Sequence, residues 1–540
     1  MNRLVLFLLL IYSTLPAQSG PGNFYLQSDE QFSKIYLDEK PLSNGINDLL
    51  VVGDTVWLAT TRGLSRTTDK GTSWKNYYGT PEFGTESITA LAYDQVTGTI
   101  WASTAHTREI TGQRLPEGSG IRVSSDNGTT WLTIPQPMDS ESDTVEIYGV
   151  NTLRALPVTV AVQNIIYDIA ITRNTIWIAA FAGGIRKTRI DSLLANVNRS
   201  WERVIVPPDR LDAIHPDSVY NFCITPVAGR FCSDNNLNYR AFSIIAVDDS
   251  TVYAGTAGGI NKTTDALIAE TSNNLRWEKI SHQNQTNPIS GNFIVAINYA
   301  PSTNTIWAAT WKAEGVTEFY GVSASTDGGQ SWSTGLRDEK VHNFTNFSSR
   351  VIAAADNGPF RSFDGGRSWL LPVNITDSET KVKLQTTAFY SAGYNAAGNE
   401  LWLGSDDGLV LNTGIGDLWP DNWKVFFASQ KLESRSATYA FPNPFSPKVE
   451  TCKIKYSTGG VRASVTIRIY NSGMQYIRTV IQNAERGDVI HTIDKNDPAG
   501  VIDYWDGKDD QGNTTANGVY FYTVEINGGE ALFGKIMVLQ

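Results

Sequence analysis

A six-residue phrase of polar, apolar and small residues recurs along most of the chain. Each copy opens with a polar residue, passes through apolar positions that usually include an aromatic residue, and closes on small residues. The copies are residues 55–60 (TVWLAT), 99–104 (TIWAST), 175–180 (TIWIAA), 251–256 (TVYAGT), 305–310 (TIWAAT), 350–355 (RVIAAA) and 400–405 (ELWLGS). Short apolar runs bounded by turn residues predict buried β-strands.

Each phrase sits inside a larger unit of four predicted strands. An apolar run lies upstream, as in 46–52, and a Gly-led and a Trp-led strand follow, as in 184–190 and 201–206. Repeated units of this kind are typical of β-propeller blades, which stack in a ring because none covers both faces of its own sheet. The predicted units are residues 46–80, 88–135, 164–207, 241–281, 293–336, 340–373 and 386–428. We therefore expect an all-β fold with a seven-bladed β-propeller over residues 18–435.

Two connections between these units, residues 136–163 and 208–240, are long for a compact domain. Such loops are more often functional than accidental, with a disordered insertion as the alternative. The second contains Cys223 and Cys232, for which export would favour a disulfide, two unpaired thiols being the alternative. Ahead of the first unit, residues 32–37 (FSKIYL) predict an outer strand that pairs with the last blade and closes the ring.

A sharper motif, Ser/Thr-x-Asp-x-Gly-x-x-Trp, occurs in four of the units. It describes a tight hairpin in which the carboxylate caps backbone N–H groups, the glycine adopts a positive φ and the tryptophan packs under the loop. The motif residues are Asp69, Gly71 and Trp74; Asp126, Gly128 and Trp131; Asp327, Gly329 and Trp332; and Asp364, Gly366 and Trp369. With this motif the chain resembles the Asp-box, or BNR, repeat proteins, which include sialidases, sortilin-type receptors and photosystem assembly factors. The resemblance implies a propeller with the motif at the blade periphery, away from the ligand face.

The character of the sequence changes at about residue 436. A Pro-rich stretch, 441–447 (FPNPFSP), precedes predicted strands at 452–456, 465–470 and 518–525. This spacing predicts a small immunoglobulin-like β-sandwich over residues 436–540. The region resembles the immunoglobulin-like domain of the flagellar hook-capping protein and the C-terminal sorting domains of the type IX secretion system. That resemblance implies recognition by secretion machinery, although the usual basic final residue is absent from 534–540 (GKIMVLQ).

The N-terminus and the charge balance indicate where the protein acts. Residues 1–17 match a secretory signal peptide, in which Arg3 precedes an apolar stretch at 4–11 and a small-residue cleavage site at 15–17. No later run is long enough for a transmembrane helix, so we expect a secreted or outer-surface protein. The formal net charge of -11 opposes binding to phosphate backbones, and nucleic acid is not an expected partner.

The sequence contains no motif that commits it to an enzyme class. A nucleophile elbow, a phosphate-binding loop and a His-Glu-x-x-His zinc site are all missing, so we predict no catalytic residue, metal or cofactor. The alternative is an Asp-box glycoside hydrolase of the sialidase type, which needs three clustered arginines, a tyrosine nucleophile and an acid/base carboxylate. The only sequence similar to that family's Arg-Ile-Pro signature is Arg114-Leu115-Pro116, inside the second unit.

We predict a non-catalytic binding or scaffold protein at the bacterial cell surface, with a glycan or a protein held by loops on one propeller face. Trp311 and Tyr320, in the long loop of the fifth unit, are the candidate ligand contacts, because exposed aromatic rings stack on sugars. Burial of both rings between blades is the alternative. Carboxylates about 5 to 10 Å apart in the central pocket, together with clustered arginines, would instead favour the hydrolase.

Overall fold

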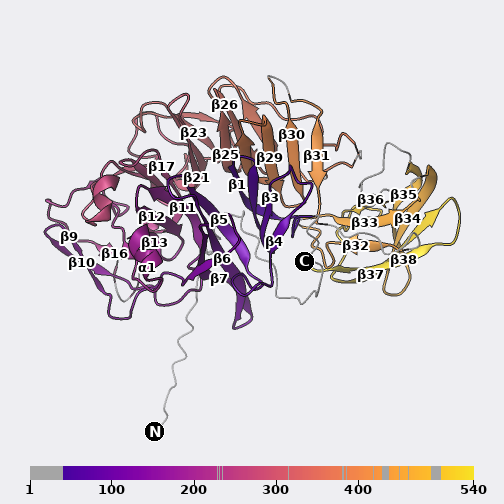
Figure 1. The fold of residues 1–540 in the computed structure, drawn as a ribbon, viewed down its shortest axis with the longest axis horizontal. Coiled ribbons are helices and arrows are strands. Elements are labelled where there is room, and N and C mark those ends of the chain that lie inside the picture. Colours follow the sequence, from indigo (N-terminus) through magenta and orange to yellow (C-terminus); the bar gives the residue numbers. More distant parts are fainter. Residues whose placement is uncertain are drawn as a thin grey trace, which may run out of the picture.

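The computed structural model describes residues 40–540 apart from 228, 230–231, 234, 314, 380–381, 385, 417–418, 429–436, 449, 460 and 488–499. The predicted signal peptide at 1–17 and the predicted closing strand at 32–37 lie outside the described residues. The regular secondary structure of the described chain is almost all β-strand, as the sequence predicts (Figure 1). None of the helices in this part is long and apolar enough to cross a membrane.

Antiparallel sheets follow one another along most of the chain. The first contains β1 (Ile46–Val52), β2 (Thr55–Thr60), β3 (Gly63–Thr67) and β4 (Lys75–Tyr77), and the second contains β5 (Ser87–Asp94), β6 (Thr99–Ile110), β7 (Gln113–Ser124) and β8 (Leu132–Ile134). The third contains β11 (Ile166–Thr172), β12 (Thr175–Ala180), β13 (Gly184–Arg189) and β14 (Glu202–Arg203). The fourth contains β17 (Ala241–Ala246), β18 (Val252–Thr256), β19 (Gly259–Thr263) and β20 (Trp277–Ile280), with β15 (Ala213–Ile214) at its edge.

The fifth to seventh sheets complete this series. The fifth contains β21 (Phe293–Ala300), β22 (Thr305–Trp311), β23 (Gly321–Ser325) and β24 (Ser333–Gly335), and the sixth contains β25 (Val341–Phe347), β26 (Arg350–Ala355) and β27 (Gly358–Ser362). The seventh contains β28 (Phe389–Asn395), β29 (Glu400–Ser405), β30 (Leu409–Thr413) and β31 (Trp423–Phe426). Short helices α1 (Ile190–Ala195), η1 (Leu237–Tyr239) and η2 (Ala266–Glu270) lie in the third and fourth units and their connection.

The first long strand of each sheet is its innermost strand, and these inner strands contact one another in chain order. β1 lies beside β5, β5 beside β11 and β11 beside β17, and the series continues through β21, β25 and β28. β28 in turn contacts β1, so the ring closes between the last sheet and the first. This arrangement is a β-propeller, and it gathers the inner strands around one axis (Figure 1).

Each of these inner strands begins with a β-bulge. The register with the second strand slips by one residue between Ile46 and Asp48, between Ile166 and Asp168, and at the matching point of the other inner strands. A bulge changes the direction in which the following side chain points. The slip therefore turns side chains such as Asp48 and Asp168 toward the axis.

The aromatic residues of the recurring phrase fill the spaces between neighbouring sheets. Trp57, Trp101, Trp177 and Trp402 are all buried. Trp101 of the second sheet shares an apolar cluster with Ile166 of the third. Because full burial of a large apolar side chain contributes about 2 to 3 kcal/mol, these contacts stabilise the stacking of sheets that would be marginal alone.

Three sheets depart from the predicted unit of four strands. In the sixth, the outer strand is reduced to a single bridge between Arg361 and Leu370, because the chain then crosses to the seventh sheet and bridges it at Asp377 and Trp423. In the third, the strand predicted at 201–206 pairs only through the two residues of β14. In the fourth, β15 comes from the second long connection and pairs with β20 as an additional strand.

The C-terminal strands form two further sheets. One joins β32 (Tyr439–Phe441), β33 (Cys452–Ser457) and β36 (Gly500–Trp505), and the other joins β35 (Tyr476–Arg486), β34 (Ala463–Asn471), β37 (Gly518–Ile526) and β38 (Leu532–Val538). Side chains of both sheets, such as Trp505 and Tyr522, share one apolar cluster. The Pro-rich stretch covers the edge of β38, where the Phe445 N–H donates to Met537 and the Phe445 carbonyl accepts from Leu539. Covering an edge in this way prevents its pairing with other chains.

A buried ion pair joins the C-terminal region to the seventh sheet. Lys453 of β33 binds Asp407, which lies between β29 and β30, and both side chains are shielded from solvent. Thr451 donates to the same carboxylate at 3.2 Å. Phe441 and Ile502 belong to the apolar cluster of the seventh sheet. The two regions therefore share a packed interface in addition to the chain that connects them.

Candidate functional site

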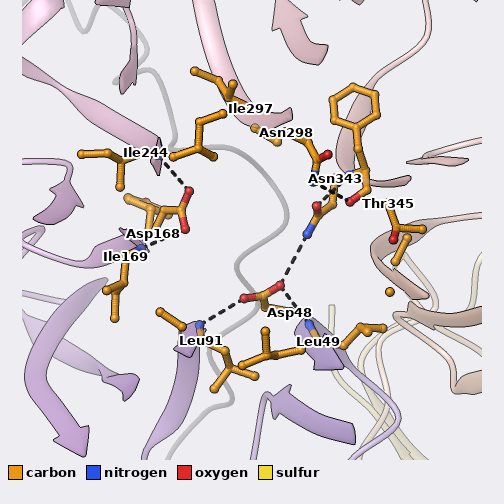
Figure 2. A pocket seen from close by; sticks show the side chains of 18 of the residues that line it. Asp48, Leu49, Leu91, Asp168, Ile169, Ile244, Ile297, Asn298, Asn343 and Thr345 are labelled. Carbon is orange, nitrogen blue, oxygen red and sulfur yellow. Dashed lines mark hydrogen bonds between the residues drawn. The ribbon is translucent and has the colours of Figure 1, made fainter. Parts of the chain in front are cut away.

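The inner strands surround a cavity of about 480 Å³ on the propeller axis. Aliphatic side chains cover much of its wall. The polar groups that enter it include Asp48, Asp168, Asn298, Asn343 and Thr345 (Figure 2). Two carboxyl groups that face one cavity make this the first candidate for chemistry.

The Asp48 carboxylate connects two neighbouring sheets. It accepts hydrogen bonds from the backbone N–H of Leu49, at 2.9 Å, and from that of Leu91 in the second sheet, at 3.1 Å. Asn343, at the bulge of β25, donates its side-chain amide to Asp48 at 3.4 Å (Figure 2). The carboxylate thus satisfies backbone donors that the strand pairing leaves open near the bulge.

Asp168 makes the matching contacts between the third and fourth sheets. It accepts hydrogen bonds from the backbone N–H groups of Ile169 and Ile244, both at 2.8 Å (Figure 2). The two aspartates therefore share one structural role. Each ties its own inner strand to the next inner strand of the ring.

Burial changes the acidity of both groups. It raises the pKa of Asp48 to about 6, although the N–H groups of Leu91 and Leu49 oppose the rise. Burial also raises the pKa of Asp168 to about 8, where the nearby charge of Asp48 adds to the effect. At neutral pH, Asp168 holds its proton while Asp48 is largely ionised. A carboxylic acid beside a carboxylate is the combination that glycoside hydrolases use.

The rest of the cavity wall does not match a sialidase. Among the described residues that line the cavity there is no arginine or lysine. Arg114 instead lies exposed near the tip of the β6–β7 hairpin, opposite Glu109. Within the described part of the chain, no group of three or more His, Cys, Asp or Glu side chains could hold a metal ion.

A row of rings runs from the cavity rim across four sheets. Phe242 stacks on Phe293 with the ring centroids 4.4 Å apart, and Phe293 stacks on Trp311 at 6.2 Å. His342 meets Trp311 edge-on at 5.4 Å and Tyr390 at 4.9 Å. Phe242, His342 and Tyr390 also line the axial cavity, so the row is continuous with it.

The two candidate ligand contacts meet at the middle of this row, where Tyr320 contacts Trp311 from the side. Trp311 ends β22 and is not in the loop where the sequence placed it, whereas Tyr320 directly precedes β23. Their rings meet edge to face at 6.0 Å, and the Lys340 ammonium lies 5.5 and 5.3 Å from the two ring centroids. Trp311 is also stacked on Phe293 and donates its indole N–H to Val341. Trp311 is therefore largely a packing residue, and the pair of Tyr320 and Lys340 presents a ring next to a cation.

The four motif loops (residues 67–74, 124–131, 325–332 and 362–369) share one hydrogen-bond pattern. In the second loop, Asp126 accepts hydrogen bonds from the backbone N–H groups of Thr129 and Thr130, and Gly128 has a φ of 77°. A hydroxyl just before the tryptophan also donates to the aspartate in each loop, from Ser73, Thr130, Ser331 and Ser368. The motif as written from the sequence leaves this hydroxyl position open, although all four copies fill it.

Each motif loop docks onto the preceding sheet of the ring. The Gly128 carbonyl accepts hydrogen bonds from Tyr77 at 2.7 Å and from Lys75 at 2.8 Å, both in the first sheet. Three of the tryptophans meet rings of the preceding sheet: Trp131 with Trp57 at 5.9 Å, Trp369 with Trp307 at 6.0 Å, and Trp74 with Phe426 at 6.0 Å. Trp332 packs in one cluster with Tyr253 of the fourth sheet. The contact of Trp74 joins the first sheet to the last.

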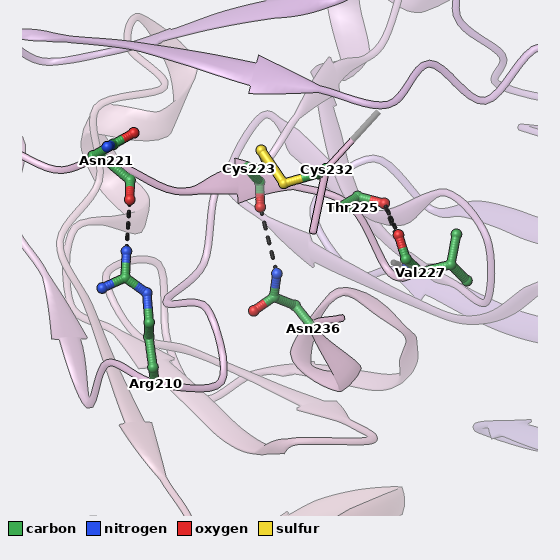
Figure 3. Close-up of a disulfide and its surroundings, with 7 residues drawn as sticks. All are labelled: Arg210, Asn221, Cys223, Thr225, Val227, Cys232 and Asn236. Atoms are coloured by element: carbon green, nitrogen blue, oxygen red, sulfur yellow. Dashed lines mark hydrogen bonds between the residues drawn. A yellow bond between two sulfur atoms is a disulfide. The ribbon is translucent and has the colours of Figure 1, made fainter. Parts of the chain in front are cut away.

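The two long connections meet in a small sheet that we call the outer lobe. It consists of β9 (Val145–Tyr148), β10 (Asn151–Ala155) and β16 (Cys223–Ile224), in the order β16-β10-β9. Cys223 and Cys232 form a disulfide beside it (Figure 3), and the Cys223 carbonyl accepts a hydrogen bond from Asn236 at 3.5 Å. The lobe lies at the rim of the molecule, far from the C-terminal sheets (Figure 1). Cys452 is a free, buried thiol.

Several residues of these sites escaped the sequence patterns. Asp48 and Asp168 had a readable signal, because aligning the apolar runs 46–52 and 166–172 places an aspartate third in both. No sequence pattern indicated the pair of Asp407 and Lys453, since the two residues stand 46 positions apart, one in the last propeller unit and one in the C-terminal region. The outer lobe likewise depends on pairing between two loops that the sequence shows only as long.

No protein-family model matches the chain, and no curated protein sequence matches it. Among solved structures it is similar to PorZ, an essential bacterial surface component of the type-IX secretion system of Porphyromonas gingivalis, at 13% identity and a TM-score of 0.36, covering 90% of this chain and 64% of that one. It is similar to the extracellular domain of a hybrid two-component system from B. thetaiotaomicron at 11% identity and a TM-score of 0.28, covering 90% and 80% of the two chains.

The WD40 β-propeller domain of Doa1 is similar at 10% identity and a TM-score of 0.39, covering 71% of this chain and 95% of that one. This chain covers 64% of the PorZ structure, which is less than two thirds of its length. At TM-scores below 0.5 these likenesses carry no argument about function. The fold described above rests on strand pairing and on the ring of inner-strand contacts.

Proposed function

We propose that this chain is an exported, non-catalytic binding or scaffold protein of the bacterial cell surface. In this proposal residues 18–435 form a seven-bladed propeller with Asp-box hairpins, and residues 436–540 form an immunoglobulin-like sorting or attachment domain. One propeller face holds a surface glycan or a protein, and secretion machinery is the partner of the C-terminal domain. The motif-loop hydrogen bonds and the ring of inner strands support this architecture.

The engagement of the two axial carboxyl groups carries the non-catalytic part of the proposal. Asp48 and Asp168 each accept two backbone N–H groups from adjacent inner strands. A carboxyl group used in this way is a structural joint, and it is poorly placed to attack or protonate a sugar. Its lone pairs already face donors that moving would leave unsatisfied.

The ligand surface in this proposal is the pair of Tyr320 and Lys340, beside the middle of the aromatic row. Tyr320 and Lys340 place a half-buried ring beside an ammonium group, which suits the apolar face and hydroxyls of a sugar or an aromatic-rich protein loop. Trp311 supports Tyr320 edge-on. Both sequence candidates therefore remain in the proposal, with Trp311 in a supporting role.

Glycan-array and pull-down screens on the full chain test this proposal. We expect a specific glycan or protein to bind, and we expect Tyr320→Ala and Lys340→Met to weaken binding. Tyr476→Ala, which removes an exposed ring from the C-terminal region, is the matched control and leaves binding unchanged. A blank result in both screens, or equal binding by all variants, counts against the proposal.

A glycoside hydrolase is the second candidate, favoured by the raised pKa of Asp168 beside the largely ionised Asp48. It predicts turnover of fluorogenic glycosides, and it predicts that Asp168→Asn and Asp48→Asn each abolish that turnover. Measurable hydrolysis lost in both variants, with folding intact by circular dichroism, would replace the binding proposal by this one.

A further inference from the structure

The outer lobe presents an open sheet edge at the rim of the molecule. β9 is the terminal strand of its sheet, and among the described residues no strand pairs with its outer side. β9 and β10 are joined by a two-residue turn, in which Gly149 has a φ of 54° as the first turn residue. A two-residue hairpin fixes which backbone groups face inward.

The hydrogen-bonding pattern of this hairpin leaves the backbone groups of two β9 residues facing away from β10. Tyr148 pairs with Asn151, and the Ala155 N–H donates to the Thr144 carbonyl at 2.9 Å. Inward pairs therefore fall on even-numbered residues of this strand, because hydrogen-bonded pairs alternate along an antiparallel ladder. The N–H and C=O groups of Val145 and Ile147 therefore point away from β10.

The side chains of these two residues are also exposed and apolar. Val145 is 51% exposed and Ile147 is 61% exposed, while Tyr148 is buried. Val150, the second turn residue, is 68% exposed, and its N–H donates to the Pro216 carbonyl. Val219, in the loop that follows Pro216, is 87% exposed. The edge thus combines outward-facing backbone groups with an apolar strip, formed by Val145 and Ile147. Protected edges instead carry charges or are covered.

Hydrogen bonds hold the outer lobe against the rest of the propeller, and a disulfide lies beside its sheet. Its edge is therefore formed before any partner binds. The Tyr148 hydroxyl donates to the Leu275 carbonyl at 2.9 Å, and the Gly149 N–H donates to Asn274 at 2.8 Å. On the inner flank, the disulfide of Cys223 holds β16 beside β10. Pre-formed edges of this kind lower the ordering cost of adding a strand.

Charge near the edge indicates the kind of segment that would fit. The loop before β9 carries Glu141 and Asp143, both exposed, whereas Asp139 and Glu146 are paired with buried arginines. On the exposed face, Arg154 lies across the ladder from Val145. Glu141 and Asp143 form no ion pair with another described residue, so this end favours a segment that brings cationic side chains.

We propose that the β9 edge of the outer lobe binds an extended segment of another protein by β-strand addition. The segment pairs with the outward backbone groups of Val145 and Ile147, places alternate apolar side chains on the apolar strip, and carries lysine or arginine between them. This inference goes beyond the proposed function and is independent of it, because the lobe lies at the rim and not at the axial cavity (Figure 1).

Synthetic ten-residue peptides of alternating valine and lysine test the proposal on the full chain. We expect the peptide to bind with a Kd below about 1 mM by fluorescence anisotropy. Two isomers, N-methylated on the valines or on the lysines, keep all side chains but remove opposite sets of N–H donors. Strand addition uses one set only, so one isomer loses binding and the other retains it.

The protein variants locate the site. Ile147→Lys is expected to weaken binding at least about tenfold, or about 1.4 kcal/mol. Val96→Lys, which replaces a residue 84% exposed between β5 and β6, is the matched control and changes nothing. Absence of binding, equal binding by both methylated isomers, or equal binding by Ile147→Lys overturns the proposal. None of these results depends on whether a ligand binds near Tyr320.

Discussion

Asp168 and Asn343 occupy the same position after the bulge of their inner strands, yet only the aspartate can titrate. Asn343 uses its carbonyl oxygen to accept from the Phe344 N–H at 2.6 Å and its amide to reach Asp48. Asp168 accepts from Ile244 in the neighbouring sheet with its second oxygen. Asn343 therefore shows that an amide side chain is accommodated at the position that Asp168 occupies in the third sheet.

The raised pKa of Asp168 gives a prediction about stability and pH. The folded carboxyl keeps its proton up to about pH 8, whereas an unfolded aspartate loses it near pH 4. Between these values the folded state binds more protons, so the free energy of unfolding falls as pH rises, by at most about 1.4 kcal/mol per pH unit for one group. Asp168→Asn should flatten this fall between pH 6 and 8, measured by urea denaturation.

Asp338→Asn is the control for that measurement, because Asp338 is an exposed surface carboxylate. It should leave the pH dependence of unfolding as in the parent protein. An Asp168→Asn protein whose stability falls between pH 6 and 8 as steeply as that of the parent would contradict the assignment.

The motif loops act as elements that join sheets. In the fourth loop, Gly365 and Gly366 have φ values of 73° and 85°, so both positions carry the same backbone strain for any other residue. Their surroundings differ: a Cβ on Gly365 meets nothing within 4 Å, whereas one on Gly366 meets Trp307 of the preceding sheet at 3.0 Å. Within one loop, Gly365 therefore serves only the turn conformation, whereas Gly366 also packs against the preceding sheet.

This pair of glycines gives a prediction with a built-in control. Gly365→Ala should lose only the cost of the left-handed backbone, about 1 to 2 kcal/mol. Gly366→Ala should lose that amount and about 1 to 3 kcal/mol more from overpacking against Trp307. Thermal unfolding of both variants measures the difference. Equal stabilities would show that the loop is a local turn without a role in sheet packing.

Periodicity made the β-sheet units readable from sequence, because each buried strand needs an apolar run and each turn needs its own residues. Residues 55–60 and 400–405 alone indicate where the second strands lie. Pattern could not show that the sixth sheet ends in one bridge at Arg361, since the competing contact at Trp423 is distant in sequence. The outer lobe escaped for the same reason. Its pairing joins loops whose residues 154 and 223 are far apart.

At the scale of the whole molecule, the ion pair of Asp407 and Lys453 couples the propeller to the C-terminal sheets. Burial raises the pKa of Asp407 even though the Lys453 charge opposes the rise. A buried pair of this kind is costly to break on one side and cheap to replace on both.

Three variants test this coupling. Lys453→Met should cost about 3 to 5 kcal/mol, because it leaves Asp407 buried without its cation. The double variant with Asp407→Leu should recover most of that loss, since the carboxylate that the single variant leaves without its cation is then gone as well. Arg462→Met, which breaks the exposed pair with Glu485, should cost no more than about 1 kcal/mol.

Calorimetry is the measurement that separates these outcomes. The Lys453→Met protein should show two thermal transitions in place of one, as the C-terminal sheets melt apart from the propeller. A single unshifted transition in that variant would mean that the interface contributes nothing to cohesion.

The seventh sheet is both the last to join the ring and the one that holds the C-terminal sheets. Trp74 packs on Phe426 where this sheet meets the first, and Lys453 reaches Asp407 on the same sheet. If the protein is attached through its C-terminal sheets, a pulling force reaches the seventh sheet first, at the seam where it meets the first sheet. Mechanical load would then open the ring at that seam, between the first and the seventh sheet.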